Sequence, residues 1–175
     1  MTTPVPLLWL GDDPARTRPA AWQTRLAQAH GAQVVPQHAE PVPLRGDWLV
    51  QLESVVRSMP RCRLIAQGLG CALLAAWAAY SSSCARVEAA LLLGPFCPQP
   101  SDPSGRYRTW REVTPLPLPF PSCVIAQPSP HSSLAAQQQS AQQWRSHWHP
   151  ATDPASQREA MQAWLHETSA QRAFL

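Results

Sequence analysis

The sequence contains no lysine, so all 14 of its basic residues are arginines. They give a net charge of only +3 against 11 acidic residues, and they form no basic run of the kind that binds nucleic acid. Charged residues make up 14% of the chain and hydrophobic residues 45%, a balance typical of a globular protein and not of a disordered one. We therefore expect a folded protein without a nucleic-acid partner.

Long hydrophobic runs are also missing. No stretch approaches the roughly 20 apolar residues of a membrane span, and the N-terminal segment lacks the basic start and the long apolar core of a secretion signal. The five cysteines, an odd number, lack the spacing of zinc or redox motifs; they lie at positions 62, 71, 84, 97 and 123. Buried, reduced thiols are therefore expected, in a cytoplasmic protein without membrane contact.

Short apolar runs alternate along the chain with segments of helical hydrophobic spacing. The expected strands are residues 6–10, 32–36, 63–66, 87–93 and 120–126. The expected helices are residues 20–30, 47–59, 69–80, 132–148 and 153–172. Asp47 is the expected N-cap of the second helix, and Asp153 followed by Pro154 is a strong start for the last one.

This alternation implies right-handed crossovers and a parallel sheet covered on both faces. The fold class is therefore α/β, a three-layer α/β/α sandwich with about five parallel strands, in one domain over residues 1–175. Twelve of the 20 prolines lie at 95–121 and 128–154, between the periodic segments, where they indicate loops. The connection at 94–119 has the length of a functional or mobile loop.

The segment from Arg63 to Trp77 has the pattern of a buried strand, a sharp Gly-x-Gly turn and an alanine-rich helix. This is the shape of a nucleophile elbow, which in α/β-hydrolases carries Gly-x-Ser-x-Gly and holds its serine beside an oxyanion-binding N–H group. The five residues here are Ala66-Gln67-Gly68-Leu69-Gly70. A glycine therefore stands at the nucleophile position.

Four segments resemble, in order, those of the small serine hydrolases of the retinoblastoma-binding-protein-nine and YdeN type, an α/β-hydrolase-like family. Residues 21–25 resemble its H-W-Q-S-R segment, and residues 64–71 resemble its V-A-H-S-L-G-C elbow. Residues 87–95 are similar to its V-x-G-A-L-L-V-A-P strand, and residues 118–122 to its L-P-F-P-S approach to the fifth strand. The resemblance covers roughly residues 5–145 and implies the strand order 2-1-3-4-5.

The resemblance also implies a Ser, Asp, His triad, and each of its positions is altered here. The nucleophile falls on Gly68, the preceding His on Gln67, and the acid near Ser129. The segment G-H-I-N, with the family's final strand and histidine, is replaced by residues 148–153. The final edge strand is therefore expected to be lost, which would leave the edge of the fifth strand open to a partner. An engineered change at Gly68 alone would not explain the other losses.

Because a triad works only as a unit, these losses predict a catalytically inactive protein with a binding or regulatory role. The N–H groups of Leu69 and near Asp12 would still hold a carboxylate or carbonyl oxygen of a small ligand. No cofactor and no metal are expected. The predicted pocket lies at the carboxyl ends of the strands; its lining is Gly11, Asp12, Gln67, Gly68, Leu69, Ser129 and His131.

Two alternatives remain open. The first is a hydrolase of small esters or amides with a displaced nucleophile, Cys71 or Ser129, and His131 or His149 as its base. The second is a homodimer or protein complex formed through the fifth-strand edge and C-terminal helix, or through the loop at 95–115.

Three further clusters have a less specific meaning. Trp110 lies among arginines in the long loop, which is typical either of a contact hot spot or of a salt-bridged loop. The stretch His147-Trp148-His149 would share one face only on a strand, so an exposed loop is expected there and not a metal site. Ser81 to Ser83 are expected to form a solvated helix end.

Overall fold

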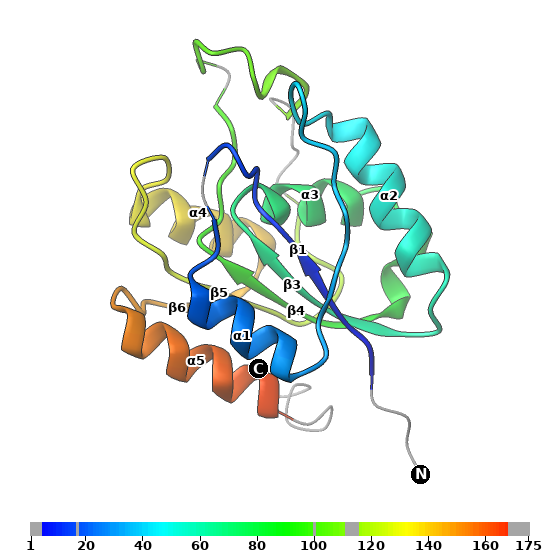
Figure 1. Cartoon of the computed structure of the whole chain (residues 1–175), viewed down its shortest axis with the longest axis vertical. Helices are drawn as coiled ribbons and strands as arrows, with labels where there is room; N and C mark the ends of the chain where they lie inside the picture. The colour runs from blue at the N-terminus through cyan, green and yellow to red at the C-terminus, as the bar shows by residue number, and fades with distance from the viewer. Residues whose placement is uncertain (1–4, 17, 100, 111–115, 168–175) are drawn as a thin grey trace.

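The structure, a computed structural model, describes residues 5–16, 18–99, 101–110 and 116–167. Its centre is a six-stranded parallel sheet in the order β2-β1-β3-β4-β5-β6 (Figure 1). The strands are β1 (Leu7–Leu10), β2 (Gln33–Val34), β3 (Cys62–Gln67), β4 (Val87–Leu93), β5 (Ser122–Ile125) and β6 (His147–His149). The α-helices are α1 (Ala21–Ala29), α2 (Arg45–Arg57), α3 (Leu69–Ala78), α4 (Leu134–Trp144) and α5 (Pro154–His166), and two 3-10 helices are η1 (Ser82–Arg86) and η2 (Arg108–Trp110).

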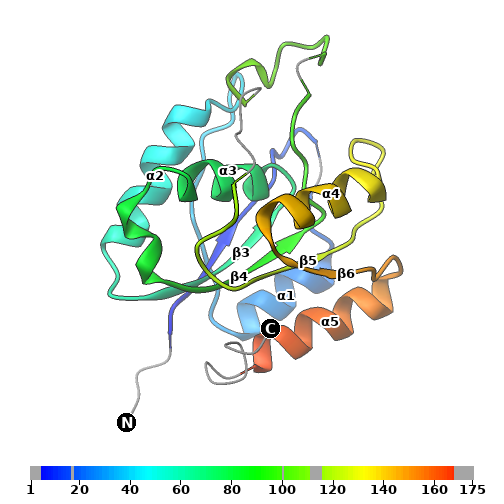
Figure 2. The ribbon, with the colours of Figure 1, turned by 180° about the vertical axis from the view of Figure 1, so that it is seen from behind.

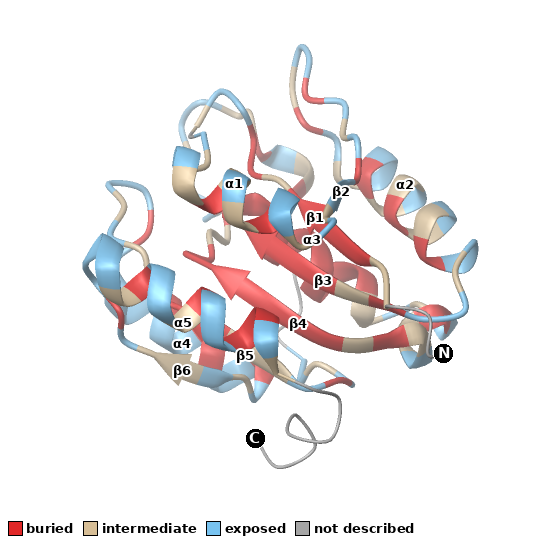
Figure 3. Ribbon diagram, turned by 60° about the horizontal axis from the view of Figure 1, so that its bottom comes forward, coloured by how far each residue is buried: buried red, intermediate tan, exposed pale blue. Residues whose placement is uncertain are grey.

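Helices cover both faces of the sheet, which confirms the three-layer α/β class. Helices α1 and α5 lie on one face, and α2, α3 and α4 lie on the other (Figure 2). Successive strand residues point to opposite faces, so Leu64 packs with α2 and α3 whereas Ile65 packs with α5. Both side chains are fully buried, and the central strands are buried along most of their length (Figure 3). This two-sided burial explains why their sequences are nearly continuous in apolar residues.

The sheet has one strand more than the sequence predicted. Strand β6 pairs in parallel with β5, with Cys123 opposite His147 and Ile125 opposite His149. The expectations of a lost final strand, of an exposed loop at His147 to His149 and of an open edge on the fifth strand are therefore wrong. The pattern gave no sign of β6 because two histidines flank its single apolar residue, Trp148, and an edge strand needs only backbone pairing on one side.

Several helix ends also differ from the predictions. Helix α2 begins at Arg45 with Leu44 as its N-cap, so Asp47 lies in the first turn and is not the cap. Helix α4 ends at Trp144 because Arg145 adopts the left-handed conformation, with φ 54°, and the chain then turns into β6. Asp153 caps α5 as expected, accepting the backbone N–H groups of Ala155 and Ser156. The predicted continuation of α5 toward residue 172 lies outside the described residues.

Within the part of the chain that the structure describes, no helix has both the length and the apolar character needed to cross a bilayer.

Glu53 ties α2 to the end of α3 and to η1. Its carboxylate accepts the Trp77 Nε1–H at 2.7 Å and the hydroxyls of Ser81 at 2.6 Å and Ser83 at 2.8 Å. Ser83 is buried, so the expectation of a solvated helix end is wrong for this residue, whereas Ser82 is exposed. The Ser81 hydroxyl does most to lower the pKa of Glu53; burial acts in the opposite direction, and Ser83, Trp77 and nearby Arg57 reinforce the lowering.

We expect Glu53→Gln to reduce the free energy of unfolding by about 1–2 kcal/mol at neutral pH, because an amide cannot accept all three hydrogen bonds as a carboxylate does. Since the folded-state pKa is lowered, this stabilisation is present above the usual value of 4.5 and is lost as the pH falls through the folded-state pKa. Urea unfolding at neutral and acid pH checks both expectations. Glu88→Gln, which breaks the exposed pair with Arg61, is the control; equal losses for the two variants would contradict the assigned role of Glu53.

Candidate functional site

The turn between β3 and α3 keeps the backbone of a nucleophile elbow. Gly68, at its centre, has φ 53° and ψ −116°, a conformation that is strained for residues with a side chain. Its N–H donates to the Leu93 oxygen of β4, and its own oxygen accepts the Phe96 N–H. Position 70 also requires glycine, because a Cβ there would lie 2.6 Å from the backbone oxygen of Leu10. The elbow is therefore preserved in shape without its nucleophile.

The side chain of Asp12 occupies the space where a nucleophile would begin. A Cβ built on Gly68 would lie 2.2 Å from both Cγ and Oδ2 of Asp12, well inside van der Waals contact. Asp12 follows β1, the neighbour of β3 in the sheet, so its carboxylate reaches the elbow from the adjacent strand. Any side chain at position 68 requires the Asp12 carboxylate to move.

The same carboxylate fills the predicted oxyanion-binding position. Asp12 Oδ1 accepts the backbone N–H of Leu69 at 2.8 Å and that of Asp13 at 2.8 Å. The Leu69 N–H belongs to the first turn of α3, where unpaired N–H groups and the helix dipole favour an anion. The sequence predicted that N–H groups at Leu69 and near Asp12 would hold a carboxylate. In the structure that carboxylate is the protein's own.

Arg16 closes the site from the solvent side. Its Nη2 lies 3.0 Å from Asp12 Oδ2 and its Nε lies 3.3 Å from Oδ1, so the pair is bidentate. The guanidinium also stacks over the ring of Phe96, 3.8 Å from the centroid. Side-chain exposure is 6% for Arg16 and 1% for Asp12. The candidate site is therefore filled by a buried ion pair, in which Arg16 Nη1 has no hydrogen-bond partner.

A second ion pair fastens the long loop beside this site. Asp13 is fully buried and accepts hydrogen bonds from Arg106 at 2.6 and 2.9 Å and from the Tyr107 hydroxyl at 2.8 Å. Burial by itself would raise the pKa of Asp13, but the hydrogen bonds from Arg106, the Ala15 N–H and Tyr107 hold it below its usual value. Trp110 is also buried. Its ring packs against Trp48, and its Nε1–H donates a hydrogen bond to the backbone oxygen of Pro43. This part of the loop is salt-bridged, and the Trp110 indole is not an exposed contact side chain.

Gln67, where the related elbows carry histidine, is buried beside α1. Its Nε2 lies 3.5 Å from Gln23 Oε1, while the same Gln23 oxygen accepts the Ala20 N–H at the start of α1. Neither amide ionises, so this pair cannot supply a base. Gln67 lies at the predicted site but has no acid–base chemistry.

The hydrogen bonds described for the turn that holds Ser129 and His131 do not reach the ion pair. Ser129 Oγ accepts the backbone N–H of His131 in an exposed turn, whose neighbour Ser132 bonds to the Pro95 oxygen. His149 lies on β6, the edge strand beyond β5. Of the predicted lining, the structure brings together Gly11, Asp12, Gly68 and Leu69 around the elbow, and Ser129 and His131 form a separate turn.

Cys71, the other candidate nucleophile, points into the core. It is fully buried, and its thiol contacts the Ala66 oxygen at 3.4 Å and the Leu93 oxygen at 3.8 Å. Burial raises the pKa of the Cys71 thiol well above its usual value, which disfavours the reactive thiolate. Among the described residues, no group of three or more His, Cys, Asp or Glu side chains is arranged to hold a metal ion.

Sequence reasoning missed Arg16 and the role of Asp12 as occupant of the site. The available signal was the pair Asp12-Asp13 directly after a buried strand, with Arg16 four residues beyond the first. The sequence alone does not place Asp12 against Gly68, which is a contact between two strands that are neighbours only in the sheet.

Comparison with known proteins supports the fold and the family. A search of curated proteins gave no significant match. A protein from Pectobacterium atrosepticum described as a YdeN-like hydrolase aligns with a TM-score of 0.67 at 14% identity, over 97% of this chain and 91% of that chain. The ydeN gene product of Bacillus subtilis aligns with a TM-score of 0.63 at 14% identity, over 93% of this chain and 100% of that chain.

An α/β-hydrolase enzyme from a sediment metagenome of the lagoon of Mar Chica aligns with a TM-score of 0.61 at 14% identity, over 97% of this chain and 92% of that chain. At such identities these likenesses concern the fold. The family assignment comes from a serine hydrolase family model, which matches residues 15–168. Since that match spans most of the chain, the chain belongs to the serine hydrolase family.

Proposed function

We propose that this chain is a catalytically inactive member of its family, which acts by binding and not by hydrolysis. The observation that carries the proposal is the Asp12 carboxylate, which takes both the volume of the missing nucleophile and the N–H groups that would stabilise an oxyanion. Catalysis of acyl transfer needs a nucleophile with a base and free oxyanion donors. Here the donors are occupied, and Gln67 replaces an ionisable neighbour.

An external carboxylate or carbonyl ligand would have to displace Asp12 and break its pair with Arg16. Separating a buried pair costs about 3–5 kcal/mol when one charge is left without its partner, which weakens any such ligand by orders of magnitude. We therefore assign the binding role to another surface of the protein. The five cysteines are all free thiols, which supports a reducing compartment such as the cytoplasm.

The alternative, a hydrolase with a displaced nucleophile, has less support. Its best thiol, Cys71, is fully buried, and its best hydroxyl, Ser129, accepts a backbone N–H in an exposed turn.

We expect no active-site labelling when the native protein is treated with a broad fluorophosphonate and with iodoacetamide and its intact mass is then measured by mass spectrometry. One stoichiometric fluorophosphonate adduct that heat denaturation abolishes would show that the proposal is wrong.

We expect Gly68→Ser to destabilise the protein by about 2–4 kcal/mol without creating a reactive serine, because the new Cβ strikes the Asp12 carboxylate and the backbone is strained. Gly31→Ser is the matched control, since Gly31 also has a positive φ of 73° but open space around it. Urea unfolding measures both losses. Equal losses for the two variants would mean that the contact with Asp12 costs nothing.

The double variant Asp12→Ala with Gly68→Ser separates the clash from the strain. Alanine at position 12 removes the atoms that the serine strikes. The double variant should therefore lose less unfolding free energy than the two single variants lose in sum, by about 1–3 kcal/mol. Strict additivity of the unfolding free energies would contradict the shared-space account. Fluorophosphonate labelling should stay absent in this variant as well, since clearing the space restores no base.

We expect Asp12→Ala to lose about 3–5 kcal/mol of stability, because it leaves Arg16 buried without its partner. Formate should recover part of this loss by binding between Arg16 and the N–H groups of Leu69 and Asp13. The measurement is the unfolding midpoint in formate compared with chloride at the same ionic strength. Asp12→Asn keeps the volume filled and is the control; formate that stabilises both variants equally, or neither, would refute the anion site.

A further inference from the structure

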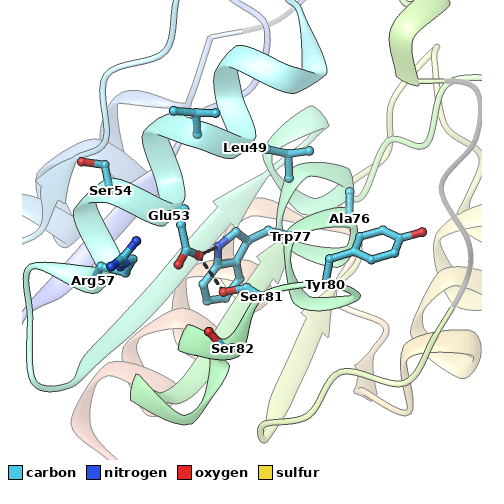
Figure 4. Close-up of a pocket in the computed structure, with 10 residues that line it drawn as sticks. Leu49, Glu53, Ser54, Arg57, Ala76, Trp77, Tyr80, Ser81 and Ser82 are labelled. Carbon is cyan, nitrogen blue, oxygen red and sulfur yellow. Dashed lines mark hydrogen bonds between the residues drawn. The ribbon is translucent and has the colours of Figure 1, made fainter.

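A surface groove lies away from the elbow, between α2 and the end of α3. It is a groove of about 600 Å³, hereafter the α2–α3 groove. In Figure 4, Glu53 and Trp77 face each other across its floor, with Leu49 above them on α2. Its lining is Leu49, Val50, Glu53, Ser54, Arg57, Ala76, Trp77, Tyr80, Ser81 and Ser82.

Two large side chains that line this groove are exposed to water. Tyr80 is 86% exposed and Val50 is 72% exposed, the highest values among the large hydrophobic side chains of the described residues. The Tyr80 ring projects from the end of α3 and points away from Glu53 (Figure 4). A small molecule held within the groove would leave both side chains in water. Their burial requires a surface that covers the rim, as a protein partner does.

The lining of the groove carries charges of both signs. Hydrogen bonds to Trp77, Ser81 and Ser83 fix the Glu53 carboxylate in place. Arg57, exposed and one helical turn further along α2, lines the same groove. An acidic and a basic side chain therefore line a face that also has a projecting aromatic ring and the α2–α3 groove.

Such a face is complementary to itself. In a two-fold contact the same patch appears on both sides, so a projection on each copy must fit a hollow on the other and each charge must meet its opposite. Here the Tyr80 ring of one copy can enter the α2–α3 groove of the second, where Arg57 approaches the Glu53 of the other copy.

We propose that the α2–α3 groove is a homodimer interface, in which each copy inserts Tyr80 into the groove of the other. The interface lies on the helical face of the sheet and not at the fifth-strand edge, which β6 covers. It does not depend on whether the elbow is catalytically inactive. Each copy contributes one groove and one aromatic anchor, so the buried area is small for a specific interface. We therefore expect a dissociation constant of about 10–100 µM.

The test is sedimentation velocity of the full chain from about 1 to about 500 µM, a range that spans the expected dissociation constant. The expected result is a monomer that becomes a dimer across this range, with a dissociation constant that rises with salt concentration. Tyr80→Ser should weaken dimerisation at least about tenfold, and Arg57→Glu should weaken it as well, since it sets like charges against each other. Both positions are exposed, and unchanged unfolding midpoints would confirm that the variants fold.

Val34→Ser is the matched control, since Val34 is 69% exposed on β2, away from the groove. It should dimerise as the wild type does. A wild type that stays monomeric at every concentration would overturn the proposal, as would a Tyr80→Ser variant that dimerises normally or a Val34→Ser variant that is equally impaired. Native mass spectrometry that shows only a monomer carrying a small-molecule adduct would overturn it in favour of a ligand groove.

Discussion

The carboxylate of Asp12 is the group on which the candidate site depends. It joins three parts of the chain that are distant in sequence: the turn after β1, the first turn of α3, and, through Arg16, the ring of Phe96 beyond β4. A buried charge is tolerated only where donors surround it. Asp12 has two backbone donors and a guanidinium, and it satisfies an N–H group that the start of α3 would otherwise leave unpaired. The ion pair is thus part of the fold and also the reason that the centre is closed.

Gly68 and Asp12 constrain each other. The separation of 2.2 Å between the Asp12 carboxyl and a Cβ at position 68 means that the two side chains cannot share the space. A serine at the elbow requires the carboxylate to leave, and the carboxylate requires a residue without a Cβ. In the proposed inactive protein, the glycine at position 68 and the carboxylate on the Leu69 N–H group are therefore consequences of the same close contact.

The sequence predicted most of the sheet because its central strands and their turns are local signals. Strand β4 matches its predicted residues, and the elbow at Gly68 and the Asp153 cap were found from patterns within a few residues. Strand β6 was missed because backbone pairing with β5, and not an apolar pattern, makes it a strand. The end of α4 was missed because Arg145, and not a glycine, adopts the left-handed conformation there. At the site, the glycine was visible in the sequence but its occupant was not, because only the neighbouring strand brings Asp12 to it.

The elbow and the α2–α3 groove differ in which groups are left without a partner. At the elbow, the carboxylate already holds the donors that a ligand would use, so binding there must first break existing contacts. At the α2–α3 groove the Glu53 carboxylate is also hydrogen-bonded, but Val50 and Tyr80 are exposed to water. Burial of apolar surface stabilises a complex without breaking any of those hydrogen bonds. In the proposed dimer, the driving force for association is therefore the burial of Val50 and Tyr80 at the groove, away from the ion pair at the elbow.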